Sequence, residues 1–92
     1  MPWFIYLNDY FIPTEVKAYT IEDAVRAGLS IARELLGSVS HYCLYEGNNE
    51  VVIEFRKDDE GAVKLIYSEN PTEALMHFYD AERKGLIRCK PA

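Results

Sequence analysis

The sequence is short of several residue types, and each shortage excludes a class of protein. It has two cysteines, Cys43 and Cys89, and no Cys-x-x-Cys pair, which excludes the multi-disulfide framework of a small secreted domain. No apolar run reaches about 18 residues, the length of a membrane-spanning helix, and no basic segment precedes the apolar start as it would in a signal peptide. We therefore expect a cytoplasmic protein without a membrane partner. Free thiols are the expected state of both cysteines, and a Cys43–Cys89 disulfide is the less favoured alternative.

Positive charge is also scarce. Lysine and arginine total 10 against 15 aspartates and glutamates, which gives a net charge of -5 at pH 7. Proteins that bind the phosphate backbone over a broad surface carry a positive charge there, so we expect no nucleic-acid partner. The bases that are present gather near the end of the sequence, at Arg83, Lys84, Arg88 and Lys90. Residues 81–92 therefore form a small basic island in an acidic chain.

Glycine-rich and calcium-binding loops are missing as well. Gly47 and Gly61 are isolated turn glycines, so no phosphate-binding loop is predicted. The acidic turn at residues 58–60 lacks the alternating acids and the terminal glutamate of a calcium loop. We expect no cofactor, and a solvated hairpin tip at this turn.

What the sequence does have is the composition of an ordinary globular domain. Of its 92 residues, 49% are hydrophobic and 27% are charged. This length is enough for one hydrophobic core and too short for two, and no linker or repeat divides it. Residues 1–92 are therefore predicted to form a single domain.

Two segments have the pattern and the end signals of helices. Residues 21–36 place their apolar side chains on one arc, with Thr20 as the N-terminal cap and Gly37 as the stop. Asn70 and Pro71 open the second helix, and a glycine at position 85 suits the left-handed conformation that ends it. Both helices should bury one face against a sheet.

The remaining segments have the pattern of strands. Residues 3–7 are β-branched and aromatic, and Asn8 and Asp9 predict a turn into a hairpin or a bent edge strand. Residues 14–19 alternate as a half-buried strand does. A meander is expected at residues 39–46, 50–57 and 62–68, and residues 86–89 can add a short edge strand.

These elements predict an α+β fold, with an antiparallel sheet of about four to five strands and two helices, in the order β(β)-α-β-β-β-α with a short C-terminal strand. We expect Tyr45 opposite Val51 and Glu54 opposite Lys64 in the meander. This register places the following side chains on the core face: His41, Cys43, Tyr45, Val51, Ile53, Phe55, Val63, Leu65 and Tyr67. The first helix should cover this face, and the second an edge or the other face.

The order also contains the αβββα succession of double-stranded-RNA-binding domains. Those domains place lysines at the start of the second helix, where they meet phosphates. Here residues 69–73 contain two acids and no base, so this family is not adopted as an identity.

One pair of residues has the chemistry of a catalytic site. His41 and Cys43 lie two apart on a strand and so share a face, where an imidazole can activate a thiolate. No orienting acid or oxyanion motif accompanies them, and the pattern is more typical of a core cysteine beside a rim histidine. His77 and Cys89 would complete the residue types of a zinc site, but the close ligand pairs are missing. We therefore predict no catalytic, cofactor-binding or metal-binding residue, and a Cys/His enzyme is the third-ranked function.

The predicted function depends on apolar side chains outside the expected core. Five aromatic residues are among the first eleven, and Phe4 and Tyr6 lie on the face opposite Trp3 and Ile5. The sheet face opposite the core is also more apolar than a solvated face needs to be. The expected interaction residues are Phe4, Tyr6, Tyr42, Leu44, Val52 and Ile66.

From this surface we predict a non-enzymatic protein-interaction module that self-associates as a homodimer. The alternative is an acidic inhibitor or decoy that binds a basic site on a nucleic-acid-handling partner.

Overall fold

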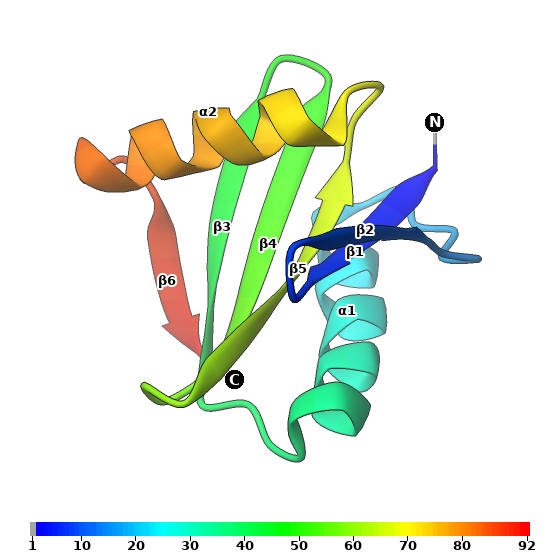
Figure 1. Ribbon diagram of the computed structural model, residues 1–92, viewed down its shortest axis with the longest axis vertical. Helices are drawn as coiled ribbons and strands as arrows, with labels where there is room; N and C mark the ends of the chain where they lie inside the picture. Colours follow the sequence, from blue (N-terminus) through cyan, green and yellow to red (C-terminus); the bar gives the residue numbers. More distant parts are fainter. Residues whose placement is uncertain (1) are drawn as a thin grey trace.

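One antiparallel sheet with a helix on each face makes up the computed structural model, which describes residues 2–92 (Figure 1). The sheet has six strands in the spatial order β2-β1-β5-β4-β3-β6, which agrees with the expected four to five strands and the short C-terminal strand. Its strands are β1 (Trp3–Leu7), β2 (Tyr10–Pro13), β3 (His41–Gly47), β4 (Glu50–Lys57), β5 (Gly61–Tyr67) and β6 (Arg88–Pro91). The helices are α1 (Ile21–Leu36), which follows β2, and α2 (Pro71–Arg83), which follows β5. The predicted α+β class and element order are confirmed.

Helix α1 begins and ends where its capping residues predict. The Thr20 hydroxyl accepts a hydrogen bond from the Asp23 backbone N–H, and Gly37 adopts a positive φ of 88° that allows its N–H to bond the Arg33 carbonyl. Ala24, Gly28 and Ala32 are the buried residues of the helix. Because these side chains are small or absent, the helix axis comes close to β4 and β5.

Helix α2 has an equally local origin. The Asn70 side chain accepts a hydrogen bond from the Glu73 backbone N–H, and Pro71 occupies the first turn. After Arg83 the chain leaves the helix, and Gly85 takes the left-handed conformation at φ 69°. The helix crosses β4 and β5 on the face opposite α1, which is one of the two positions expected for it.

The segment after the first hairpin differs from the prediction. Asn8 and Asp9 both have positive φ, as a two-residue hairpin turn requires, so β1 and β2 form the expected hairpin. Residues 14–20 are irregular rather than a half-buried strand. Thr14 closes back onto β1 through two bonds to the Trp3 carbonyl, and Tyr19 is 93% exposed. Alternation alone therefore misassigned this segment, which runs from the sheet edge to α1.

The β3–β4 register is shifted by one residue from the predicted one. Tyr45 lies opposite Val52, because the loop contains only Asn48 and Asn49 and Gly47 pairs with Glu50 as a strand residue. A shift of one residue exchanges the two faces of a strand. The side chains expected with the core under α1, those of His41, Cys43 and Tyr45, lie on the α2 face instead. The predicted pairing of Glu54 with Lys64 is confirmed.

Each sheet face carries its own hydrophobic cluster. The buried residues between α1 and the sheet are Trp3, Ile5, Ala24, Ala32, Ile53, Phe55, Val63 and Leu65, and those between α2 and the sheet are Val52, Ile66, Ala74, Leu75 and Phe78. The sheet centre is thus covered on both sides, as strands apolar on both faces require. Neither helix within residues 2–92 is long and apolar enough to cross a membrane.

The two cysteines are joined. Cys43 on β3 lies directly opposite Cys89 on β6, and the two form a disulfide across the adjacent strands. The expectation of two free thiols is therefore wrong for this structure. The reason is the C-terminal strand: β6 pairs along β3 and brings Cys89 beside a residue 46 positions away in sequence.

Candidate functional site

The six predicted interaction residues do not form one surface. Val52 and Ile66 are fully buried beneath α2, and Phe4 and Tyr6 are partly buried on β1. Tyr42 and Leu44 lie on the opposite face, because of the register shift in β3. An exposed outer sheet face made of these six residues is therefore absent from the described structure.

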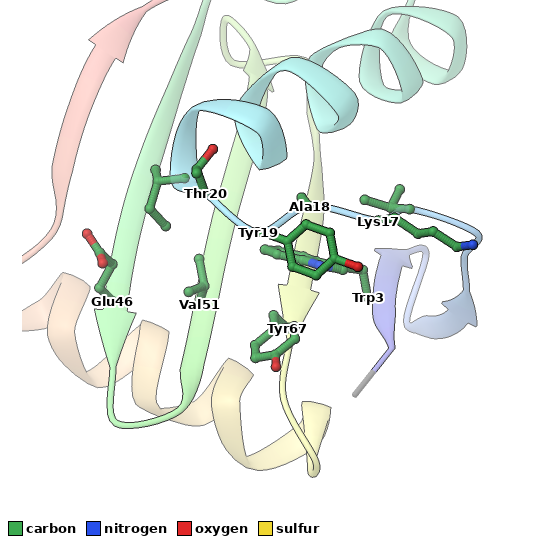
Figure 2. A pocket seen from close by; sticks show the side chains of 10 residues that line it. Trp3, Lys17, Ala18, Tyr19, Thr20, Glu46, Val51 and Tyr67 are labelled. Carbon is green, nitrogen blue, oxygen red and sulfur yellow. The ribbon is translucent and has the colours of Figure 1, made fainter.

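A first hollow opens at the start of α1, with a volume of about 610 Å³ (Figure 2). Trp3 and Tyr67 lie at one end of it, with ring centroids 5.1 Å apart, and the exposed Tyr19 ring stands beside them. Val51 and Glu46 lie toward the other end. We refer to this space as the aromatic hollow. Residues 16–20 line it on the side of the segment that leads into α1.

A second hollow of about 560 Å³ runs between α1 and the strands β3 and β6. Its apolar floor consists of Val25 and Leu29 of α1 and Tyr42 and Leu44 of β3. Its bases are Arg26 on α1 and Arg88 and Lys90 on β6, and two acids, Glu22 and Glu46, also line it. We call this space the basic groove. It exists because α1 covers β4 and β5 and leaves β3 and β6 uncovered on this face.

Strand pairing fixes the bases beside the apolar floor. In the β3–β6 register, Leu44 lies opposite Arg88 and Tyr42 lies opposite Lys90. Residues directly opposite in antiparallel strands project to the same face. The aliphatic part of each base can therefore lie along the apolar side chain next to it, with the charge at the rim.

The charges of the basic groove are only partly neutralised. Arg88 lies 3.6 Å from a Glu46 carboxylate oxygen, and Arg26 lies 2.9 Å from Asp23. Lys90 has no ion-pair partner within residues 2–92. Glu46 and Ile21 also line the aromatic hollow, so the two hollows meet at the start of α1.

A network of charges under α2 has a structural role. Glu54 on β4 pairs with Lys64 at 3.0 Å, and both side chains are only 8% exposed. Arg56 pairs with Glu54 as well, and reaches Glu82 of α2 at 2.7 Å. The Lys64 ammonium also lies over the rings of Tyr6, Phe78 and Tyr79. These contacts neutralise the buried charges and join α2 to the sheet.

A histidine and a carboxylate meet at the edge of α2. His77 Nδ1 lies 2.8 Å from a Glu50 oxygen, and this hydrogen bond raises the pKa of the imidazole, with the charges of Glu73 and Asp80 adding to the effect. Burial, together with the neighbouring Glu50, raises the pKa of the Tyr45 hydroxyl. A base held by a carboxylate is one part of a nucleophilic site, but no serine, threonine or cysteine side chain among residues 2–92 forms a hydrogen bond with this imidazole.

His41 and Cys43 do not form the catalytic pair considered from the sequence. Cys43 is fully buried and its sulfur is bonded to Cys89, so it carries no thiolate. His41 Nδ1 shares a hydrogen bond of 2.9 Å with the Ser40 hydroxyl. The metal alternative has no geometric support either, since no cluster of three or more His, Cys, Asp or Glu side chains suited to a metal occurs in residues 2–92.

Sequence reasoning found the parts of the basic groove but not their arrangement. Tyr42 and Leu44 were among the expected interaction residues, and the basic island was noted separately, but the sequence analysis did not connect the two. The alternation of Arg88, Cys89 and Lys90 would have done so, because a Cys43–Cys89 bond fixes which bases face Tyr42 and Leu44.

In the basic groove, apolar side chains and bases therefore lie together on the surface of residues 2–92, although the chain as a whole is acidic. In comparisons with known proteins, this chain matches no protein-family model, no curated protein and no solved structure.

Proposed function

We propose that this chain is a protein-interaction module whose basic groove binds an acidic segment of a partner protein, with apolar side chains of that segment on the groove floor. The observation that carries the proposal is the pairing of Leu44 with Arg88 and of Tyr42 with Lys90, in a chain whose net charge is -5. Bases concentrated beside an apolar floor favour an apolar anchor flanked by carboxylates.

The two kinds of contact have different physical roles. Burying apolar surface of Val25, Leu29 and Leu44 supplies affinity, because it removes that surface from water. The charges of Arg88 and Lys90 accelerate encounter and select against basic partners, an effect that salt weakens. Binding should therefore weaken as ionic strength rises, without disappearing.

The homodimer predicted from the sequence needs a different contact from the one first expected. A second copy could reach Val52 and Ile66 only if α2 left the sheet, since both residues are fully buried beneath it. For this reason we place the proposed contact on the α1 face. The test described below can also show self-association through the basic groove. It can equally favour the acidic inhibitor or decoy, which would bind its partner through surfaces outside the groove.

The direct test is an NMR titration of the ¹⁵N-labelled protein with the acetylated, amidated peptide Asp-Leu-Asp-Tyr-Asp-Leu. We expect saturable shifts at residues that line the basic groove. A matched peptide with lysine in place of each aspartate should bind much more weakly. Equal binding of the two peptides, or shifts confined to other parts of the protein, would contradict the proposal.

Matched variants then separate groove contacts from general effects. Lys90→Gln should weaken binding of the acidic peptide, whereas Lys84→Gln should not, because Lys84 belongs to the same basic island but pairs with Asp80 on α2. Likewise Leu44→Ser should weaken binding and Leu86→Ser should not, since Leu86 is exposed and lies outside the groove. Sedimentation of the unliganded protein tests self-association. If the protein is a dimer that the acidic peptide dissociates, the groove binds a second copy of this chain rather than a different protein.

A further inference from the structure

We propose that the Cys43–Cys89 disulfide is a redox-sensitive clamp that holds β6 in place and so controls the basic groove. The inference rests on the proposed function, because it names the regulation of the same site. Its first part, the control of β6, concerns the fold alone and can be tested without any ligand.

Strand β6 has few other contacts that hold it. It is four residues long, all of them exposed, and it is an edge strand that pairs only with β3. A backbone bond of 3.1 Å from the Ala92 N–H to the Ser40 carbonyl closes its far end. An edge strand with no buried side chain has little local stability. The covalent bond to Cys43 adds to the backbone pairing with β3 and to the Arg88–Glu46 contact of 3.6 Å, and of these links it is the one that does not break when the strand frays.

The clamp lies between the two bases of the groove wall. Cys89 separates Arg88 from Lys90 and pairs with Cys43, so the bond fixes the register that sets both bases beside the apolar floor. Cys89 projects to the opposite face from Arg88 and Lys90, because side chains alternate along a strand. The bond can therefore control the groove without occupying it.

The two cysteines differ in exposure, which favours one route of reduction. Cys43 is fully buried, whereas Cys89 is exposed. A thiolate of a dithiol reductant attacks the Cys89 sulfur, the sulfur–sulfur bond breaks, and the Cys43 sulfur leaves and takes a proton. The second thiol of the reductant then attacks the mixed disulfide, which releases Cys89 as a thiol. The reductant loses two electrons and becomes a cyclic disulfide, and the protein gains two thiols.

After reduction, β6 can leave the sheet edge and carry Arg88 and Lys90 away from the groove floor. The affinity for an acidic ligand then falls in proportion to the population that keeps β6 paired. If about a tenth of the reduced molecules keep it, the apparent affinity falls about tenfold. The rest of the sheet should persist, because α1 and α2 both pack on β4 and β5.

The first arm of the test is hydrogen exchange of the protein as purified and after treatment with dithiothreitol, which leaves the sequence unchanged. Native mass spectrometry after iodoacetamide should show no modified cysteine before reduction. After reduction, the amides of residues 88–91 and their β3 partners Tyr42 and Leu44 should exchange faster, while those of β4 and β5 stay protected. Two alkylated thiols in the protein purified without reductant, or unchanged protection of β6 after reduction, would overturn the clamp.

The second arm measures the affinity for the acidic peptide in both redox states. Reduction should weaken binding, and the double variant Cys43→Ala with Cys89→Ala should bind as weakly in either state and no longer respond to dithiothreitol. Lys90→Gln, which weakens peptide binding by the oxidised protein, should have little further effect on binding by the reduced protein. Equal affinity in the two redox states, with β6 shown to be released, would overturn control of the groove. Absence of peptide binding by the oxidised protein would instead contradict the proposed function. The hydrogen-exchange data would still show whether the disulfide holds β6 in place.

Discussion

Gly28 of α1 faces the ring of Phe55 on β4 so closely that a Cβ atom at this position would lie 2.5 Å from Phe55 Cζ. The same atom would lie 3.1 Å from a methyl group of Leu65 on β5. Helix and sheet therefore touch at a point where only glycine fits, and Phe55 and Leu65 are both fully buried there. This contact sets the distance of α1 from the sheet, and with it the width of the space on either side of the helix.

The first prediction concerns this contact. Gly28→Leu should lower the free energy of unfolding by about 1–3 kcal/mol, because a larger side chain can enter only if α1 and Phe55 separate. Thermal unfolding followed by circular dichroism measures the loss. Gly61→Ala is the matched control, since a Cβ there would meet only a Leu36 methyl group at 3.7 Å, an ordinary contact. A melting temperature for Gly28→Leu equal to that of the control would show that α1 packs in another way.

The second prediction distinguishes a core position from an interface position. Val52 is fully buried beneath α2, so Val52→Lys should destabilise the fold by about 4 kcal/mol or more, because it buries an unpaired charge. Were Val52 a contact to a second copy, the variant would remain folded and become monomeric. Urea unfolding and sedimentation separate these results, with Met76→Lys on the exposed side of α2 as the control.

The third prediction concerns the two members of the buried ion pair. Glu54→Leu should cost about 3–5 kcal/mol, because it leaves Lys64 and Arg56 without their shared carboxylate. Lys64→Met should cost less, about 1–3 kcal/mol, because Glu54 keeps Arg56 as a partner. Denaturant unfolding of both variants gives the comparison. A larger loss for Lys64→Met would mean that the aromatic rings around Lys64 matter more than the carboxylate.

The fourth prediction is a pH dependence at His77. Its hydrogen bond to Glu50 raises the pKa of the imidazole in the folded protein. The stability from this pair is therefore fully present below the pKa of the unfolded histidine, and it is lost as the pH rises through the folded-state pKa.

Proton NMR of the His77 ring should give a pKa above that of an ordinary histidine. Glu50→Gln should return it toward the ordinary value, and Glu73→Gln should have a smaller effect, because that carboxylate lies 3.8 Å from Nε2. An unchanged pKa in Glu50→Gln would show that the hydrogen bond is not formed in solution.

The elements that could be predicted from the sequence are those with local causes. Helix α1 lies at the predicted residues because Thr20 and Gly37 satisfy its ends through bonds within a few residues. The turn at Asn8 and Asp9 was predictable for the same reason. The β3 register was not, because it depends on whether Gly47 belongs to the loop or to the strand, a difference of one residue that reverses every side chain of β3.

The candidate site was predictable only in pieces, because it joins segments far apart in the chain. Leu44 and Arg88 become neighbours only when β6 pairs with β3. The four residues of β6 are all exposed, so they have no apolar pattern from which this pairing could be predicted. The acidic composition pointed away from a basic surface, since a net charge averages over the whole chain. The groove thus depends on tertiary pairing that neither composition nor periodicity records.

The bond between Cys43 and Cys89 also changes how the chain transmits force. It closes a covalent loop over a sequence separation of 46 residues, which contains β4, β5 and α2. If the oxidised chain is pulled from its two ends, tension passes from β3 to β6 through the sulfur atoms and bypasses everything within the loop. The hairpin β1–β2 and helix α1 can unravel, but the looped segment cannot be drawn out as a single thread. A translocation pore that pulls this chain from one end must therefore be wide enough for two segments of polypeptide side by side. Through a narrower pore the chain can pass only after the disulfide is reduced.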